Sequence, residues 1–131
     1  MRTLGLLLAL SAVLGAPSGA AALTGFSSPS GNIGCYLDRN GVRCDIAKRT
    51  WSPPRKPASC HLDYGQGMAL ASRARFVCAG DTALGAKHTL AYGRTIRAGR
   101  YSCTSSSAGM TCRNRVTGHG FTLARQRYRI F

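Results

Sequence analysis

Short segments of alternating hydrophobic and polar residues recur along the chain, and glycine-rich turns separate them. In residues 73–78 and 121–123 the apolar side chains fall at every second position, which is the period of a β-strand. Residues 89–92 and 100–104 form two further short segments of this kind, each close to a glycine. Short strands at such intervals predict an all-β, mainly antiparallel fold, either a small sandwich or a barrel.

Two segments depart from this pattern. In residues 124–131, Tyr128 and Phe131 lie at helical spacing, which predicts a short closing helical turn. Residues 48–59 contain three prolines, which exclude a helix or a central strand, so we expect a surface crossover there. Trp51 is expected to pin this crossover to the core. The alternative is an exposed tryptophan that serves as a platform for a ligand.

The start of the chain has the pattern of a secretory signal peptide. Arg2 precedes an apolar run over residues 4–14, and small residues follow up to Ala22. The run is too short to span a bilayer, which takes about 20 residues. The pattern predicts a signal peptide over residues 1–22 and a single secreted domain over residues 23–131. A buried N-terminal helix is the alternative, and no cysteine lies near the cleavage site to carry a lipid anchor.

The cysteines have a repeated spacing that predicts their pairing. Eight residues separate Cys35 from Cys44, and eight separate Cys103 from Cys112, with Gly41 or Gly109 at the same place in each segment. A four-residue loop ending at that glycine makes each segment a β-hairpin with its two cysteines directly opposite. Opposed residues are close enough for a disulfide. The pairs Cys35–Cys44 and Cys103–Cys112 follow, and Cys60–Cys78 follows by elimination.

These disulfides are expected to contribute much of the stability. In the chain-entropy model a ten-residue loop contributes about 2.7 kcal/mol and a 19-residue loop about 3.2 kcal/mol. A zinc site is the rival interpretation of the cysteines. Structural zinc sites use cysteine pairs with two to four residues between them, and the sequence has no such pair. We therefore expect no metal and no cofactor.

The chain is strongly basic. It has 18 Lys and Arg against 4 Asp and Glu in 131 residues, a formal net charge of +14, and its 44% hydrophobic content excludes a disordered basic tail. Arg125, Arg127 and Arg129 alternate, so they would share one face of a strand. Because guanidinium groups bind phosphate and carboxylate in bidentate fashion, these three are candidate anion-binding residues. The alternative is a generic solvated basic surface.

His119 is the candidate catalytic residue. It lies between Gly118 and Gly120, which leave the imidazole accessible. With His61 or His88 it would form a general acid–base pair, and arginines would bind the phosphates of a ribonuclease-like substrate. The alternative is a turn whose histidine makes a local hydrogen bond.

Asp63 and Asp81 form a second candidate pair. Each lies three residues after a cysteine of the predicted Cys60–Cys78 disulfide, so the two carboxylates would be near each other. A glycosidase needs two such carboxylates, one of them with a raised pKa. The alternative is that both aspartates form turns or pair with arginines. The even number of cysteines leaves no free thiol for a catalytic cysteine.

The order of several motifs resembles that of a bacterial family of small exported domains, common in actinobacteria. The motifs are SPSGNIGC at residues 28–35, VRCDI at 42–46, GDT at 80–82 and GHGF at 118–121. The resemblance covers nearly all of the chain after the signal peptide. It implies export and one compact disulfide-bearing domain of unknown function, and it implies no activity or ligand.

The sequence favours a non-enzymatic binding protein of the cell envelope or medium, whose basic surface attracts anionic polymers or a protein partner. A small secreted hydrolase that uses His119 is the first alternative. A cationic membrane-active protein is the second, although no long amphipathic helix is evident.

Overall fold

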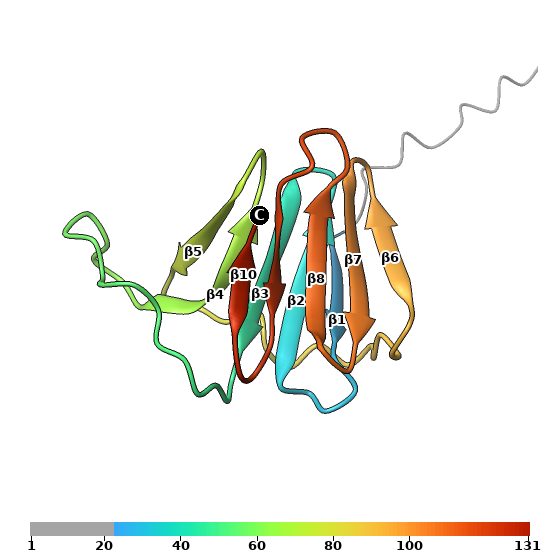
Figure 1. Cartoon of the computed structure of the whole chain (residues 1–131), viewed down its shortest axis with the longest axis horizontal. Helices are drawn as coiled ribbons and strands as arrows, with labels where there is room; N and C mark the ends of the chain where they lie inside the picture. The colour runs from blue at the N-terminus through green and yellow to red at the C-terminus, as the bar shows by residue number, and fades with distance from the viewer. Residues whose placement is uncertain (1–22) are drawn as a thin grey trace, which may run out of the picture.

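Two five-stranded antiparallel sheets pack face to face in the computed structural model, which describes residues 23–131 (Figure 1). The first sheet contains β1 (Thr24–Ser27), β2 (Ile33–Asp38), β3 (Gly41–Ile46), β4 (Tyr64–Leu70) and β5 (Ala74–Cys78). The second contains β6 (Thr95–Ala98), β7 (Tyr101–Ser106), β8 (Gly109–Asn114), β9 (Gly120–Leu123) and β10 (Tyr128–Ile130). In each sheet, strands that are consecutive in sequence are neighbours. The predicted all-β fold is confirmed, and it is a sandwich because the sheets do not close into a barrel.

The two predicted hairpins are β2–β3 and β7–β8. Cys35 lies opposite Cys44 in the first, and Cys103 lies opposite Cys112 in the second. The glycine that begins the return strand is required in both hairpins. Gly109 has a φ of 128°, and a Cβ on Gly41 would lie 2.6 Å from the carbonyl oxygen of Leu70.

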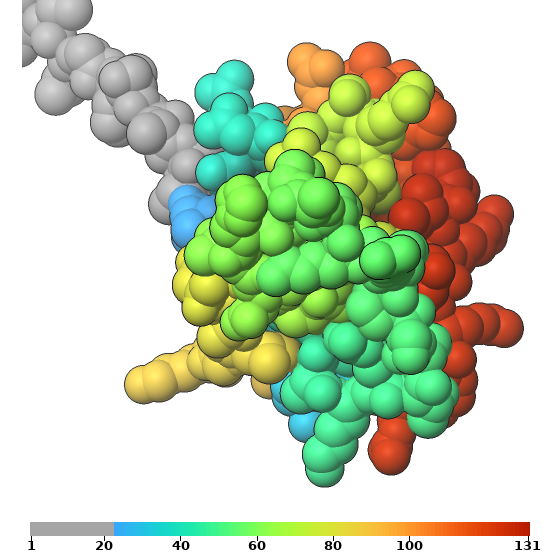
Figure 2. Space-filling view, turned by 90° about the vertical axis from the view of Figure 1, so that its left-hand side faces the viewer, coloured from blue at the N-terminus to red at the C-terminus, as the bar shows by residue number. Residues whose placement is uncertain are grey.

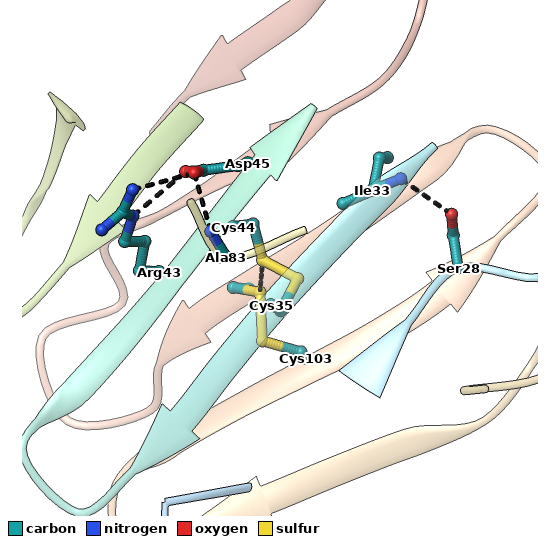
Figure 3. The surroundings of a disulfide bond; sticks show 9 residues. Ser28, Ile33, Cys35, Arg43, Cys44, Asp45, Ala83 and Cys103 are labelled. Carbon is teal, nitrogen blue, oxygen red and sulfur yellow. Dashed lines mark hydrogen bonds and ion pairs between the residues drawn. A yellow bond between two sulfur atoms is a disulfide. The ribbon is translucent and has the colours of Figure 1, made fainter. Parts of the chain in front are cut away.

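The three disulfides of the structure are Cys35–Cys44, Cys60–Cys78 and Cys103–Cys112, the pairs that the spacing predicts. The two hairpin disulfides point into the core from opposite sheets, and the Sγ atoms of Cys44 and Cys112 are 3.7 Å apart (Figure 3). Three sulfurs of this cluster lie close enough together to hold a metal ion. Residues 23–131 contain no free cysteine, so these sulfurs are not available as thiolate ligands.

The crossover between β3 and β4 covers one edge of the sandwich, the side that faces the viewer in Figure 2. Trp51 anchors it, as predicted. The indole Nε1 donates a hydrogen bond to the carbonyl oxygen of Ala124 at 2.7 Å, and the ring packs against Phe76 and Tyr128. Since Ala124 belongs to the second sheet's side of the molecule, Trp51 also joins the two sheets.

The segment between β5 and β6 covers part of the outer face of the first sheet. A Cβ on Gly34 would collide with the carbonyl oxygen of Ala83, so glycine is needed where this segment crosses β2. Asp45 of β3 is 1% exposed, and its carboxylate accepts a hydrogen bond from the Ala83 amide at 2.9 Å (Figure 3). The SPSGN, VRCDI and GDT motifs thus lie in or beside this part of the first sheet.

Two of the predicted elements are wrong. The segment predicted to form a closing helical turn contains strand β10 instead. Tyr128 pairs with Leu123, and Phe131 exchanges two backbone hydrogen bonds with Gly120. Hydrogen bonding to the edge of β9 therefore determines the conformation of this segment, although its two aromatic residues have helical spacing. Residues 89–92 form a single bridge, from Ser27 to Thr89, and a turn instead of a strand.

The predicted signal peptide, residues 1–22, lies outside the described residues. In residues 23–131 we find no helix with the length and apolar character needed to cross a membrane.

Candidate functional site

The outer face of the second sheet carries only hydroxyl and guanidinium side chains on β6, β7 and β8. The inward residues of these strands are buried or half-buried, and the outward residues reach solvent. No other segment of residues 23–131 covers this face, which points toward the viewer in Figure 1. We call it the arginine–threonine face and define it by its outward side chains: Thr95, Arg97, Ser102, Thr104, Thr111, Arg113, Thr122 and Arg129.

Four threonines form a continuous row across β6, β7, β8 and β9, because each lies directly opposite the next: Thr95, Thr104, Thr111 and Thr122. Their hydroxyl groups bond in pairs, at 2.7 Å between Thr95 and Thr104 and at 2.9 Å between Thr111 and Thr122. In each pair one hydroxyl donates and the other accepts. One hydroxyl proton of each pair thus stays available to a ligand.

The arginines of the face lie on alternate strands. Arg97 on β6 and Arg113 on β8 have Ser102 of β7 between them, and Arg129 is on β10. Neighbouring strands are about 4.8 Å apart, so the strands that carry the arginines are about 10 Å apart. Arg129 also lies two residues along the sheet from the register of Arg97 and Arg113. All three side chains are exposed. The face therefore carries one arginine on each of β6, β8 and β10.

Phe131 links two of these arginines. Its ring lies under both guanidinium groups, with its centroid 5.0 Å from Cζ of Arg113 and 5.1 Å from Cζ of Arg129. Gly120 leaves the space for it, since a Cβ there would come within 2.9 Å of the ring. His119 Nδ1 is 3.3 Å from the carbonyl oxygen of Phe131. Phe131 thus gives the two guanidinium groups a common aromatic contact.

The face has no acidic neighbour in the sequence. Residues 82–131 contain no Asp or Glu and nine basic residues: Lys87, Arg94, Arg97, Arg100, Arg113, Arg115, Arg125, Arg127 and Arg129. Within residues 23–131 the side-chain ion pairs are those of Arg43 with Asp45 and Asp81, both on the first sheet's side. The guanidinium groups of the face therefore form no ion pair with an Asp or Glu side chain of the described residues.

The structure separates the three arginines that alternate in the sequence. Arg129 belongs to the face, and Arg127 joins it in a depression of about 440 Å³ that Thr122 and Tyr128 also line. Arg125 lies in the β9–β10 connection and lines a different cleft. They do not share one strand face because the extended strand is limited to Tyr128–Ile130.

The three histidines lie in separate parts of the fold. His119 is in the β8–β9 connection, at the upper end of the sandwich in Figure 1, and its hydrogen bond goes to the neighbouring Phe131. His88 is in the segment at the lower end, where its carbonyl oxygen accepts from Ser27. His61 follows Cys60 in the crossover. The fold thus gives His119 neither of the partners that the acid–base pair required.

Asp63 and Asp81 do line one depression, of about 460 Å³, together with Arg49. Asp81 accepts a hydrogen bond from Arg43 Nη1 at 2.6 Å. This hydrogen bond and the charge of Arg43 lower the pKa of Asp81. A glycosidase acid requires a raised pKa, so Asp81 does not fit that role and matches the alternative of an aspartate that binds an arginine.

Sequence reasoning missed Arg113, Phe131 and the threonine row. A signal for part of this face does exist, because the pattern Thr-x-Arg occurs at residues 95–97 and again at 111–113. On strands, that pattern places both side chains on one face.

Comparisons with known proteins give a family and nothing more specific. No curated protein and no solved structure matches the chain. Residues 3–131 match the family of unknown function DUF6636. Because that match covers nearly the whole sequence, the chain belongs to the family of unknown function DUF6636.

Proposed function

We propose that the protein is a secreted, non-enzymatic binding domain whose arginine–threonine face binds a phosphate-bearing polymer of the cell envelope or medium. The observation that carries this proposal is the exposed set of Arg97, Arg113 and Arg129, which form no ion pair with an Asp or Glu side chain of residues 23–131. Three disulfides in a small domain support export, as does the predicted signal peptide.

The shape of the face favours a polymer over a small anion. Its charges are spread over five strands, about 20 Å, and are not gathered around one point. A chain with repeated phosphates can meet each guanidinium group in turn, and the threonine hydroxyls between them can donate to phosphate or sugar oxygens. The aromatic ring of Phe131 keeps two of the charges ordered, which lowers the entropy lost on binding.

The test compares two variants that each lose three charges. The first carries Arg97→Gln, Arg113→Gln and Arg129→Gln. The control carries Arg55→Gln, Lys56→Gln and Lys87→Gln, which are exposed and lie off the face. Binding to poly(glycerol phosphate) and to single-stranded RNA is measured over a range of salt concentrations. We expect the face to contribute about −2 to the slope of log K against log salt, from about −0.7 for each phosphate contact.

The face variant should lose that contribution on at least one polymer, and the control variant should keep it. Equal losses in both variants would mean that the net charge acts without a site, and would overturn the proposal. The polymer that binds at physiological salt identifies the source of the phosphates. Cleavage of the RNA that His119→Ala abolishes would replace this proposal by the hydrolase alternative, and binding to anionic liposomes alone would replace it by the membrane-active one.

A further inference from the structure

A cleft of about 440 Å³ opens between loops of both sheets. These loops lie at one end of the sandwich, the lower end in Figure 1. The walls of the cleft are the β1–β2 connection, the residues after β3, the β7–β8 turn, the β9–β10 connection and Tyr92. Volumes of this size are typical of sites for small ligands. The cleft is separate from the arginine–threonine face and has none of its residues.

Of residues 23–131, two cations line the cleft, Lys48 and Arg125, and no Asp or Glu does. The backbone beneath each cation is fixed. The side-chain amide of Asn32 donates to the carbonyl oxygen of Lys48 at 3.0 Å and accepts from its amide nitrogen at 2.7 Å. The amide of Thr50 donates to the carbonyl oxygen of Arg125 at 2.8 Å. The positions from which both charged side chains extend are therefore set by contacts within the protein.

The SPSGN motif, in the β1–β2 connection, forms one wall of the cleft. The amide of Gly31 donates to the carbonyl oxygen of Ser28 at 2.9 Å, and the hydroxyl of Ser28 accepts from the amide of Ile33 at 3.1 Å (Figure 3). The tight turn that results presents the Ser30 hydroxyl and the Asn32 side chain at the cleft. On the opposite wall, Ser107 adds another hydroxyl group. The Ser106 hydroxyl there donates to the carbonyl oxygen of Gly109 at 3.3 Å and accepts from the Ala108 amide at 3.1 Å.

Tyr92 supplies an aromatic surface at the rim. Its side chain lies at the tip of a turn closed by the hydrogen bond from the Arg94 amide to the carbonyl oxygen of Ala91. The turn is tied to the second sheet because Gly93 donates to the carbonyl oxygen of Ser105 at 2.7 Å. Tyr92 is 55% exposed although it is a large aromatic residue on a fixed turn. An exposed ring in this setting is available to stack against a ligand.

We propose that this cleft binds a saccharide unit that bears an anionic group. Lys48 and Arg125 would receive the phosphate or carboxylate, because they are the charged groups of the cleft. The serine hydroxyls and the backbone of the motif would bond the sugar hydroxyls. Tyr92 would cover the apolar C–H face of the ring. A free anion would use only the cations, and a neutral sugar would leave them unpaired.

The test is a titration of the isotopically labelled, disulfide-intact domain, residues 23–131, followed by nuclear magnetic resonance. The probes are glucose 6-phosphate, glucuronic acid, glucose and inorganic phosphate. The two anionic sugars should shift the amide signals of residues 28–33, 106–109 and 124–126. They should also bind at least about tenfold more tightly than glucose or phosphate, since a charge-assisted hydrogen bond adds that factor or more.

The variant Lys48→Gln with Arg125→Gln should weaken the binding of anionic sugars at least about tenfold. Tyr92→Ala should weaken it as well, and Tyr92→Phe should restore it. The variant that carries Arg55→Gln, Lys56→Gln and Lys87→Gln is the control, because these residues belong neither to the cleft nor to the arginine–threonine face, and it should bind these probes like the unchanged protein. The polymer test and this test change different residues and use different probes, so failure of one is distinguishable from failure of the other.

Three results would overturn the proposal. Inorganic phosphate that binds as tightly as glucose 6-phosphate would show an anion site without sugar recognition. Glucose that binds as tightly as the anionic sugars would show that the two cations take no part. No shift in the cleft residues with any probe would show that the cleft does not bind this class of ligand.

Discussion

Asp45 shows how a single side chain can hold several segments together. Its carboxylate accepts from Arg43 Nε at 3.1 Å, from Arg43 Nη2 at 2.8 Å and from the Ala83 amide at 2.9 Å. Arg43 in turn binds Asp81, and its pKa is raised despite the desolvation of the guanidinium group, which acts in the opposite direction. This network connects β3 to the segment that covers the first sheet.

At the scale of the residue, we predict that Asp45→Ala lowers the free energy of unfolding by about 3 kcal/mol. The variant leaves the buried Ala83 amide without an acceptor and removes the more buried partner of Arg43. Urea unfolding measures the change. Asp81→Ala is the matched control, because it removes the exposed partner of the same arginine, and its effect should be clearly smaller. Equal effects would show that burial of Asp45 does not matter.

At the scale of the element, the two hairpin disulfides do more than close loops. Cys35–Cys44 and Cys103–Cys112 are fully buried and touch each other between the sheets. Cys60–Cys78 closes a longer loop but lies at the periphery, where Cys78 is exposed. The sulfur atoms of the two hairpin disulfides therefore contribute more to core packing than those of Cys60–Cys78. The chain-entropy model favours the longer Cys60–Cys78 loop by only about 0.5 kcal/mol.

We predict that Cys35→Ala with Cys44→Ala lowers the stability by about 4 kcal/mol, through loss of both the crosslink and the buried sulfurs. Cys60→Ala with Cys78→Ala should cost about 3 kcal/mol, since little core volume is lost. Denaturant unfolding of the two double variants gives the order. A larger loss for the Cys60–Cys78 pair would mean that loop length outweighs packing.

At the scale of the whole molecule, the acidic residues are confined to one part of the chain, whereas basic residues occur throughout it. The four aspartates all precede residue 82, and the strands that follow carry only basic charged groups. In three dimensions the exposed face of the second sheet has basic residues without Asp or Glu, while the first sheet, whose part of the chain contains all four aspartates, is partly covered by its own chain.

This asymmetry predicts one-sided binding of a phosphate polymer. Amide signals of β6, β7, β8, β9 and β10 should shift when the polymer is added at low salt, and those of β1, β2 and β3 should remain in place. Nuclear magnetic resonance of the labelled domain makes this measurement. Uniform shifts over both sheets would contradict a single binding face. The predicted shifts should shrink as salt is added, because the released counterions return to the polymer.

Local patterns determined much of this protein. The alternation of side chains and the equal spacing of Cys35–Cys44 and Cys103–Cys112 predicted strands, hairpins and an all-β fold, because hairpin register depends on residues close in sequence. Other features needed the tertiary structure. Residues 124–131 have helical spacing, but Tyr128–Ile130 form a strand that pairs with β9. Without this pairing the edge of β9 would lack hydrogen-bond partners within the protein.

Neither proposed site could be predicted from local sequence patterns, because each depends on contacts between segments far apart in the chain. Arg113 and Phe131 meet because Gly120 pairs with both of their strands, and the threonine row needs the register of four strands at once. The cleft needs loops from both sheets. A sequence by itself determines which side chains alternate along a strand. Only the packing of the sheets decides which face stays open to solvent, because that depends on contacts between residues far apart in the chain.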